Sequence, residues 1–182
     1  MAYLTLIRHA PTPFNNEKIF MGSLDIPCIN IEMSQIKAIT NLVNVNEYSI
    51  CYTSPLNRAL CTANALFDKK IIKVDSNLIE RSLGIFEGKY KDEIKLLFPE
   101  AFSSSGILDI TYTPAHGETC EDLINRVKKF LESLLIYKEN EKIAVITHNG
   151  VCKAIEVILN NKAIQEVFNN DFQFLMPQTY SL

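Results

Sequence analysis

The stretch that decides the fold is Tyr3-Leu4-Thr5-Leu6-Ile7-Arg8-His9-Ala10-Pro11-Thr12. Its first half, residues 3–7, is a short apolar run that is typical of a buried strand. Arg8-His9 follows at the end of that run, and Ala10-Pro11 breaks any continuation. The pair therefore stands at the carboxyl end of a strand, where ligands bind in open α/β sheets. It suits an oxyanion such as phosphate, because Arg offers a planar fork of donors and neutral His offers a nucleophilic nitrogen.

Taken alone, an Arg-His pair is more often a solvated loop, so the rest of the chain has to decide. The 182 residues, 47% hydrophobic and 21% charged, indicate one globular domain over residues 1–182. No apolar run approaches a membrane span and no signal peptide is evident, so we expect no membrane partner. Five cysteines without paired metal spacing favour a reducing, cytoplasmic location. The net charge of −3 leaves no basic footprint for nucleic acid.

Two further apolar runs end in the same manner as the first. Residues 49–53 lead into Ser54-Pro55, which we predict to cap and start a helix that presents Arg58 from its first turn. Residues 143–147 end in His148-Asn149-Gly150, before a helix over 151–159. Amphipathic patterns also predict helices over residues 29–43 and after Thr119. Short runs over residues 172–176 and 179–182 predict closing strands. Strands alternating with helices predict a three-layer α/β/α sandwich with a mostly parallel central sheet.

In such a sheet the three strand ends converge on one edge, bringing together two Arg and two His: Arg8, His9, Arg58 and His148. For Arg58 alone, a solvent-facing helix position is an equal alternative. Phosphoryl transfer explains the cluster, because its transition state spreads negative charge over three oxygens. A metal site is the rival explanation for two His, but ligand spacings are absent and two Arg would repel a cation. We therefore predict no metal and no other cofactor.

Acidic residues in two segments are candidates for acid–base work. Glu80 and Glu87 lie among apolar residues and glycines, where a carboxyl group can keep its proton near neutrality, although solvated loop charges are the commoner case. Glu118 has either a site role or a role at the dipole of the helix that follows it. Residues 90–115 predict a short helix and a surface loop, with a mobile tip at residues 103–106.

The motifs together resemble the histidine phosphatase superfamily, also called phosphoglycerate mutase-like proteins. They occur in family order: Arg8-His9 with Thr12 and Asn15; Gly22-x-x-Asp25-x-Pro27; Ser54-Pro55-x-x-Arg58-Ala59-x-x-Thr62-Ala63; Glu80 with Gly84, Glu87 and Gly88; Gly117-Glu118-Thr119; and Thr147-His148-x-Gly150. The resemblance implies that His9 is the phosphorylated nucleophile and that Arg8, Arg58 and His148 hold the phosphoryl group. It implies Glu80 as the general acid and base. Asn15, Gly22 and Asn149 are the further candidate substrate contacts.

Departures from the family pattern bear on the substrate. Ala10-Pro11 replaces the usual Gly-Glu or Gly-Gln, and Met21 stands where mutases place a small hydroxyl residue. Residues 90–115 carry only Lys91 and Lys95 as bases, and the C-terminal residues 179–182 are too short and uncharged to form a lid. These features predict a phosphomonoesterase for a small phosphorylated metabolite. Short members similar to α-ribazole phosphatase suggest a sugar- or nucleoside-type monophosphate.

Two alternatives stay open. One is a cofactor-dependent phosphoglycerate mutase, which must keep its phosphohistidine away from water. The other is a regulatory module that binds phosphate without turnover, which would not need Glu80. A homodimer is left open as well.

Overall fold

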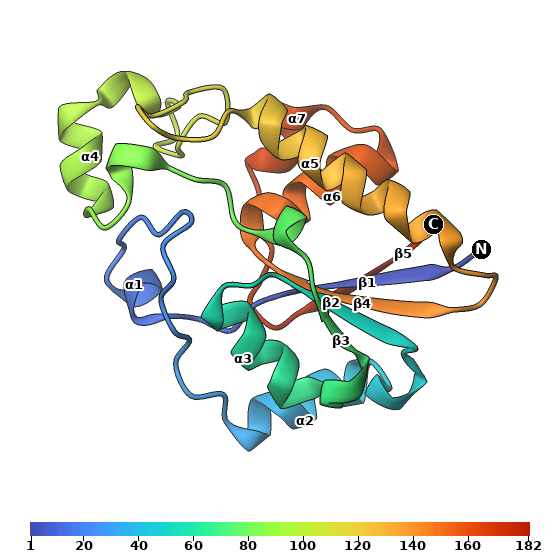
Figure 1. The fold of residues 1–182 in the computed structure, drawn as a ribbon. Helices are drawn as coiled ribbons and strands as arrows, with labels where there is room; N and C mark the ends of the chain where they lie inside the picture. Colours follow the sequence, from blue (N-terminus) through green and yellow to red (C-terminus); the bar gives the residue numbers. More distant parts are fainter.

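A computed structural model describes all of residues 1–182 and shows a five-stranded sheet between helices (Figure 1). The sheet order is β3-β2-β4-β1-β5, and four strands are parallel while β5 runs antiparallel to β1. The strands are β1 (Tyr3–Arg8), β2 (Ile50–Thr53), β3 (Ile72–Val74), β4 (Lys142–Thr147) and β5 (Pro177–Ser181). The mostly parallel sheet confirms the predicted α/β architecture.

Helices cover both faces of the sheet (Figure 1). One face packs against α5 (Cys120–Ser133) and α6 (Asn149–Asn160), with α7 (Ile164–Phe168) beside α6. The other face packs against α2 (Met33–Leu42) and α3 (Asn57–Leu66). β1 divides its side chains between the two cores, because Leu4 and Leu6 join the first cluster and Ile7 joins the second. This double coverage explains why β1 and β4 are apolar along nearly their whole length.

A third, smaller apolar cluster lies away from the sheet and supports α4 (Lys91–Leu97). Phe20, Phe86, Ile94 and Ala101 form its centre, and the loop after α4 folds back over them. Figure 1 shows α4 and this loop standing apart from the two main layers, above the short helix α1 (Pro13–Asn16). The stretch expected to be a surface loop is therefore partly folded around its own core.

Two predicted elements differ from those observed. α3 begins at Asn57, so Ser54 precedes the helix by three residues instead of capping it. Residues 172–176 form no strand and pair only at one isolated bridge between Phe174 and Arg8, whereas β5 supplies the closing edge strand. None of the helices is both long and apolar enough to cross a membrane.

Candidate active site

His9 follows directly after β1 and lies almost completely buried, with 2% of its surface exposed. Its backbone N–H donates to the carbonyl of Thr147 at the end of β4, so the two strand ends are tied together. Nδ1 lies 2.6 Å from the carbonyl oxygen of Ala10, which requires the proton on Nδ1 and leaves the lone pair on Nε2. Burial, with the charge of Arg58, lowers the pKa of His9 to about 3. The imidazole is therefore neutral at physiological pH.

Arg58, the second residue of α3, is buried against His9 and the loop that contains Gly22. Its guanidinium donates to the carbonyls of Gly22 at 2.8 Å and Leu24 at 2.5 Å. Its Nε donates to Nδ1 of His148 at 3.1 Å. One side chain thus joins the three parts of the chain that surround the strand ends.

His148 follows β4 and is fully buried behind His9, with 5.0 Å between the centres of the two rings. Both of its ring nitrogens are engaged, because Nδ1 accepts from Arg58 and Nε2 lies 2.7 Å from the hydroxyl oxygen of Ser54. Burial and the neighbouring charges hold the pKa of His148 well below its usual value. His148 belongs to the cluster but does not line the pocket beside it.

Arg8 is fixed by the segment that precedes β5. Its guanidinium donates to the Phe172 carbonyl at 2.6 Å and lies 3.7 Å from the centre of the Phe174 ring. Its Nε is buried and has no partner in the protein. A buried donor without a partner is costly, so this atom marks a place where an oxyanion would be favourable.

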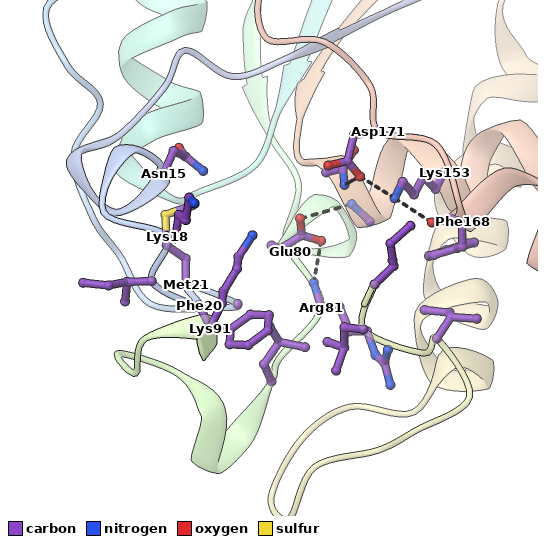
Figure 2. Close-up of a pocket in the computed structure, with 18 of the residues that line it drawn as sticks. Asn15, Lys18, Phe20, Met21, Glu80, Arg81, Lys91, Lys153, Phe168 and Asp171 are labelled. Carbon is purple, nitrogen blue, oxygen red and sulfur yellow. Dashed lines mark hydrogen bonds and ion pairs between the residues drawn. The ribbon is translucent and has the colours of Figure 1, made fainter. Parts of the chain in front are cut away.

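Two residues of α6, one turn apart, hold that segment in place. Asn149 donates to Asp171 at 2.8 Å and accepts from the N–H of Phe172 at 3.0 Å. Lys153 donates to Asp171 at 2.7 Å and to the Phe168 carbonyl at 3.0 Å, as Figure 2 shows. Asn149 lines the pocket, but both ends of its amide are used within the protein. Its place in the structure is that of a support for Arg8.

Glu80 faces the pocket with its carboxylate fixed by two backbone donors (Figure 2). The N–H of Arg81 donates to Oε1 at 2.8 Å and the N–H of Gly150 donates to Oε2 at 3.1 Å. Gly150 permits this approach, because a Cβ atom there would lie 2.4 Å from Oε1. The carboxyl group is therefore held at the start of α6, close to the strand end that carries His148.

The other two acids have structural positions. Glu87 accepts from the N–H groups of Ser23 and Leu83, both at 2.8 Å, and so fixes the loop that holds Arg58. Gly22 in that loop has φ of +50°, and a Cβ atom there would lie 2.2 Å from Glu87. Glu118 pairs with Arg126 at 2.6 Å and does not line the pocket.

These groups surround one pocket of about 420 Å³. Its lining includes seven of the eight predicted site residues, namely Arg8, His9, Asn15, Gly22, Arg58, Glu80 and Asn149. Asn15 accepts from the N–H of Thr12 through Oδ1, which leaves its NH₂ group unbonded. No group of three or more His, Cys, Asp or Glu side chains is arranged to hold a metal ion.

Four pocket lysines had no functional prediction: Lys18, Lys91, Lys95 and Lys153. The sequence analysis noted Lys91 and Lys95 only because residues 90–115 contain no other bases. That small number of bases argued against a substrate-binding role for this segment. Lys18 and Lys153 lie in no motif, and only the spatial meeting of α1, α4 and α6 brings them to this cavity. Figure 2 shows Lys18, Lys91 and Lys153 in the same pocket as Glu80.

Comparison with known proteins shows which family the chain belongs to. The family model described as "Histidine phosphatase superfamily (branch 1)" matches residues 4–173, which confirms the resemblance. The chain is 31% identical to the metal-independent phosphoserine phosphatase of Arabidopsis thaliana, over 84% of this chain and 66% of that protein. It is 33% identical to the fructose-2,6-bisphosphatase TIGAR of Xenopus tropicalis, over 72% of this chain but only 49% of that protein. The chain thus spans about half the length of the frog relative.

A solved structure shares the fold across nearly the whole chain. The Bacillus stearothermophilus protein YhfR superposes with a TM-score of 0.85 and 26% identity, covering 98% of this chain and 90% of that one. This match confirms the predicted α/β architecture with a mostly parallel central sheet.

Proposed function

Because this chain belongs to branch 1 of the histidine phosphatase superfamily, we propose that it hydrolyses a phosphomonoester of a small metabolite through a phosphohistidine on His9. The observation that carries this proposal is the state of His9. Its proton is on Nδ1, its Nε2 keeps a lone pair, and Arg8 and Arg58 bring positive charge to the same pocket. A neutral imidazole beside two guanidinium groups suits attack on a phosphoryl group, whose charge the arginines offset.

The reaction then runs in two displacements. Nε2 of His9 attacks phosphorus, a P–N bond forms as the P–O bond to the alcohol breaks, and Glu80 gives its proton to the departing oxygen. Water next attacks phosphorus while the Glu80 carboxylate takes its proton. The P–N bond breaks, phosphate leaves and His9 is again neutral. Both backbone donors on Glu80 hold the carboxyl group in one place through the cycle.

The hydrogen bonds of His148 bear on its predicted contact with phosphate. Arg58 and Ser54 fix the ring of His148 behind His9, so the predicted phosphate contact from His148 requires a shift in these hydrogen bonds. We place the activity in the cytoplasm, which the five free thiols favour.

The test is capture of the intermediate. Purified protein is mixed with a radiolabelled aryl phosphate and quenched in alkali, where phosphohistidine survives and an acyl phosphate does not. We expect a labelled protein in the wild type and in His116→Ala, a control at an exposed histidine. We expect no label and no turnover in His9→Ala.

Excess chelator should leave the rate unchanged. Binding of phosphate esters without label in any form would favour the non-catalytic module, and interconversion of phosphoglycerates without phosphate release would favour the mutase.

A further inference from the structure

The side of the pocket formed by α1 and α4 carries three lysines that the proposed mechanism does not use, Lys18, Lys91 and Lys95, and the backbone joins the first two. Lys18 follows α1 and Lys91 is the first residue of α4, and both side chains line the same cavity as His9. Figure 2 shows the Lys91 side chain extending from beside Phe20 into the space in front of Glu80, with Lys18 near Asn15. The two lysines come from segments distant in sequence, so their meeting is a property of the fold.

The backbone joins these two positions directly. The N–H of Lys91 donates to the carbonyl of Lys18 at 2.9 Å, and the adjacent residues Ile19 and Tyr90 form an isolated antiparallel bridge. Lys18 itself has a left-handed backbone with φ of 56°, a conformation that is strained for a non-glycine residue. Strain of this kind persists where the surrounding structure enforces it, and here it occurs at the wall of the candidate active site.

Neither lysine has a counter-ion or a hydrogen-bond acceptor within the protein. Of the other bases of the pocket, Lys153 pairs with Asp171 at 2.7 Å and Arg81 donates to the carbonyls of Tyr112 and Glu118. Lys95 of α4 also lines the pocket and has no such partner. The carboxylates of the pocket do not neutralise its positive charge, because basic side chains outnumber acidic ones along its lining. Lys18, Lys91 and Lys95 are therefore the lysines of this wall without a counter-ion, and the Nζ of Lys91 lies 5.6 Å from the centre of the Phe20 ring.

Lys18 and Lys91 line the same pocket as Arg8, His9 and Arg58, so these positive charges act on one another. Removal from water lowers the pKa of Lys91, Asp171 opposes that effect, and the charges of Arg8, Lys18 and Lys153 lower it further. Like charges brought together without a counter-ion destabilise one another. An anion between Lys18 and Lys91 would relieve this repulsion, as the proposed function assigns to phosphate between Arg8 and Arg58.

We propose that Lys18 and Lys91 form a second anion-binding subsite, so that the substrate is a phosphomonoester carrying a second anionic group, a carboxylate or another phosphate. This inference rests on the proposed function, because it assigns the phosphoryl group to the arginine side of the pocket. About 420 Å³ holds a small metabolite that reaches both sides. The uncharged sugar or nucleoside group expected from the sequence would leave both ammonium groups unpartnered.

The test compares substrates that differ only in the second charge. Phosphate release is measured for 3-phosphoglycerate against glycerol 3-phosphate, and for fructose 1,6-bisphosphate against fructose 6-phosphate. In the wild type we expect kcat/KM to be at least about tenfold higher for one or both doubly anionic members, the two pairs separating carboxylate from phosphate. In K18Q/K91Q that ratio should fall at least about tenfold. The control Lys89→Gln changes charge near Lys91 but outside the pocket and should keep the ratio.

Binding to His9→Ala, measured by calorimetry with the same ligand pairs, separates the two proposals. Tighter binding of the doubly anionic ligand, lost in His9→Ala/K18Q/K91Q, supports the subsite even where the wild type shows no turnover and the proposed function fails. Turnover of an aryl phosphate with equal kcat/KM and equal binding within each pair overturns the subsite while the proposed function stands. A preference that survives in K18Q/K91Q overturns it as well.

Discussion

Acid should destabilise this protein through its buried histidines, and His9 offers the clearest measurement. The pKa of His9 is about 3 in the folded protein, against about 6.5 in an unfolded chain. Because the folded value is the lower one, the unfolded state binds more protons between these pH values. The stability contributed by neutral His9 is therefore complete above about pH 6.5 and is lost as the pH falls toward about 3.

The size of the effect follows from linkage. Between about pH 6 and about pH 4.5, the histidine of the unfolded chain carries nearly one proton and native His9 carries almost none. Lowering the pH across this interval therefore removes about 2 kcal/mol from the free energy of unfolding. Replacing His9 by Asn removes this titration while keeping an amide near the Ala10 carbonyl that Nδ1 contacts. The difference in unfolding free energy between wild type and His9→Asn should therefore shrink by about 2 kcal/mol over this interval.

The assay is urea denaturation followed by circular dichroism at a series of pH values. Carboxylates titrate in both proteins, so the comparison isolates His9. His116→Asn is the matched control, because His116 is exposed and Asn tolerates its left-handed backbone, where φ is 61°. Its curve should run parallel to that of the wild type. A wild-type and His9→Asn pair that also runs parallel would refute the claim that native His9 is held neutral.

Three substitutions test the supports of the site. Arg58→Lys should lower kcat/KM at least about 100-fold with the circular dichroism spectrum unchanged, because an ammonium cannot reach both loop carbonyls and His148 at once; a loss below about fivefold would contradict this. Lys153→Met should lower kcat/KM about 10- to 100-fold by loosening the segment that holds Arg8, whereas Lys162→Met, at a more exposed ion pair, should change it less than about twofold. Glu80→Gln should slow alkyl phosphates far more than aryl phosphates, whose oxygen leaves without a proton; equal slowing would count against the general acid.

The sequence by itself determined the order of the strands along the chain and the groups placed at their ends. Residues 3–7, 49–53 and 143–147 can be recognised as strands because a strand covered on both faces has few polar positions. Parallel strands present their carboxyl ends at one edge, so the pattern also predicted that Arg8, His9 and His148 would meet. The same pattern placed Arg58 in the first turn of the helix that follows residues 49–53, whereas the role of Glu80 as general acid and base came from the family motif.

What only the tertiary structure decided concerns hydrogen bonds between distant segments. Ser54 was predicted to cap a helix, yet it contacts His148, because α3 begins three residues later. Asn149 was predicted to touch substrate, and the structure adds that its amide bonds to Asp171 and to the N–H of Phe172 while the residue lines the pocket. A helix-capping or ligand-binding residue type has several compatible partners, and the local sequence does not say which one the fold brings near.

The basic wall of the pocket shows the same limit most clearly. Lys18 and Lys91 have no local pattern in common, and each taken alone resembles an ordinary surface lysine. They meet because a backbone hydrogen bond joins Lys91 to Lys18 and the cluster around Phe86 holds α4 over α1. The sequence does not show which of two distant lysines will lie close together, because packing sets the distance between them. This side of the site therefore depended wholly on the tertiary structure.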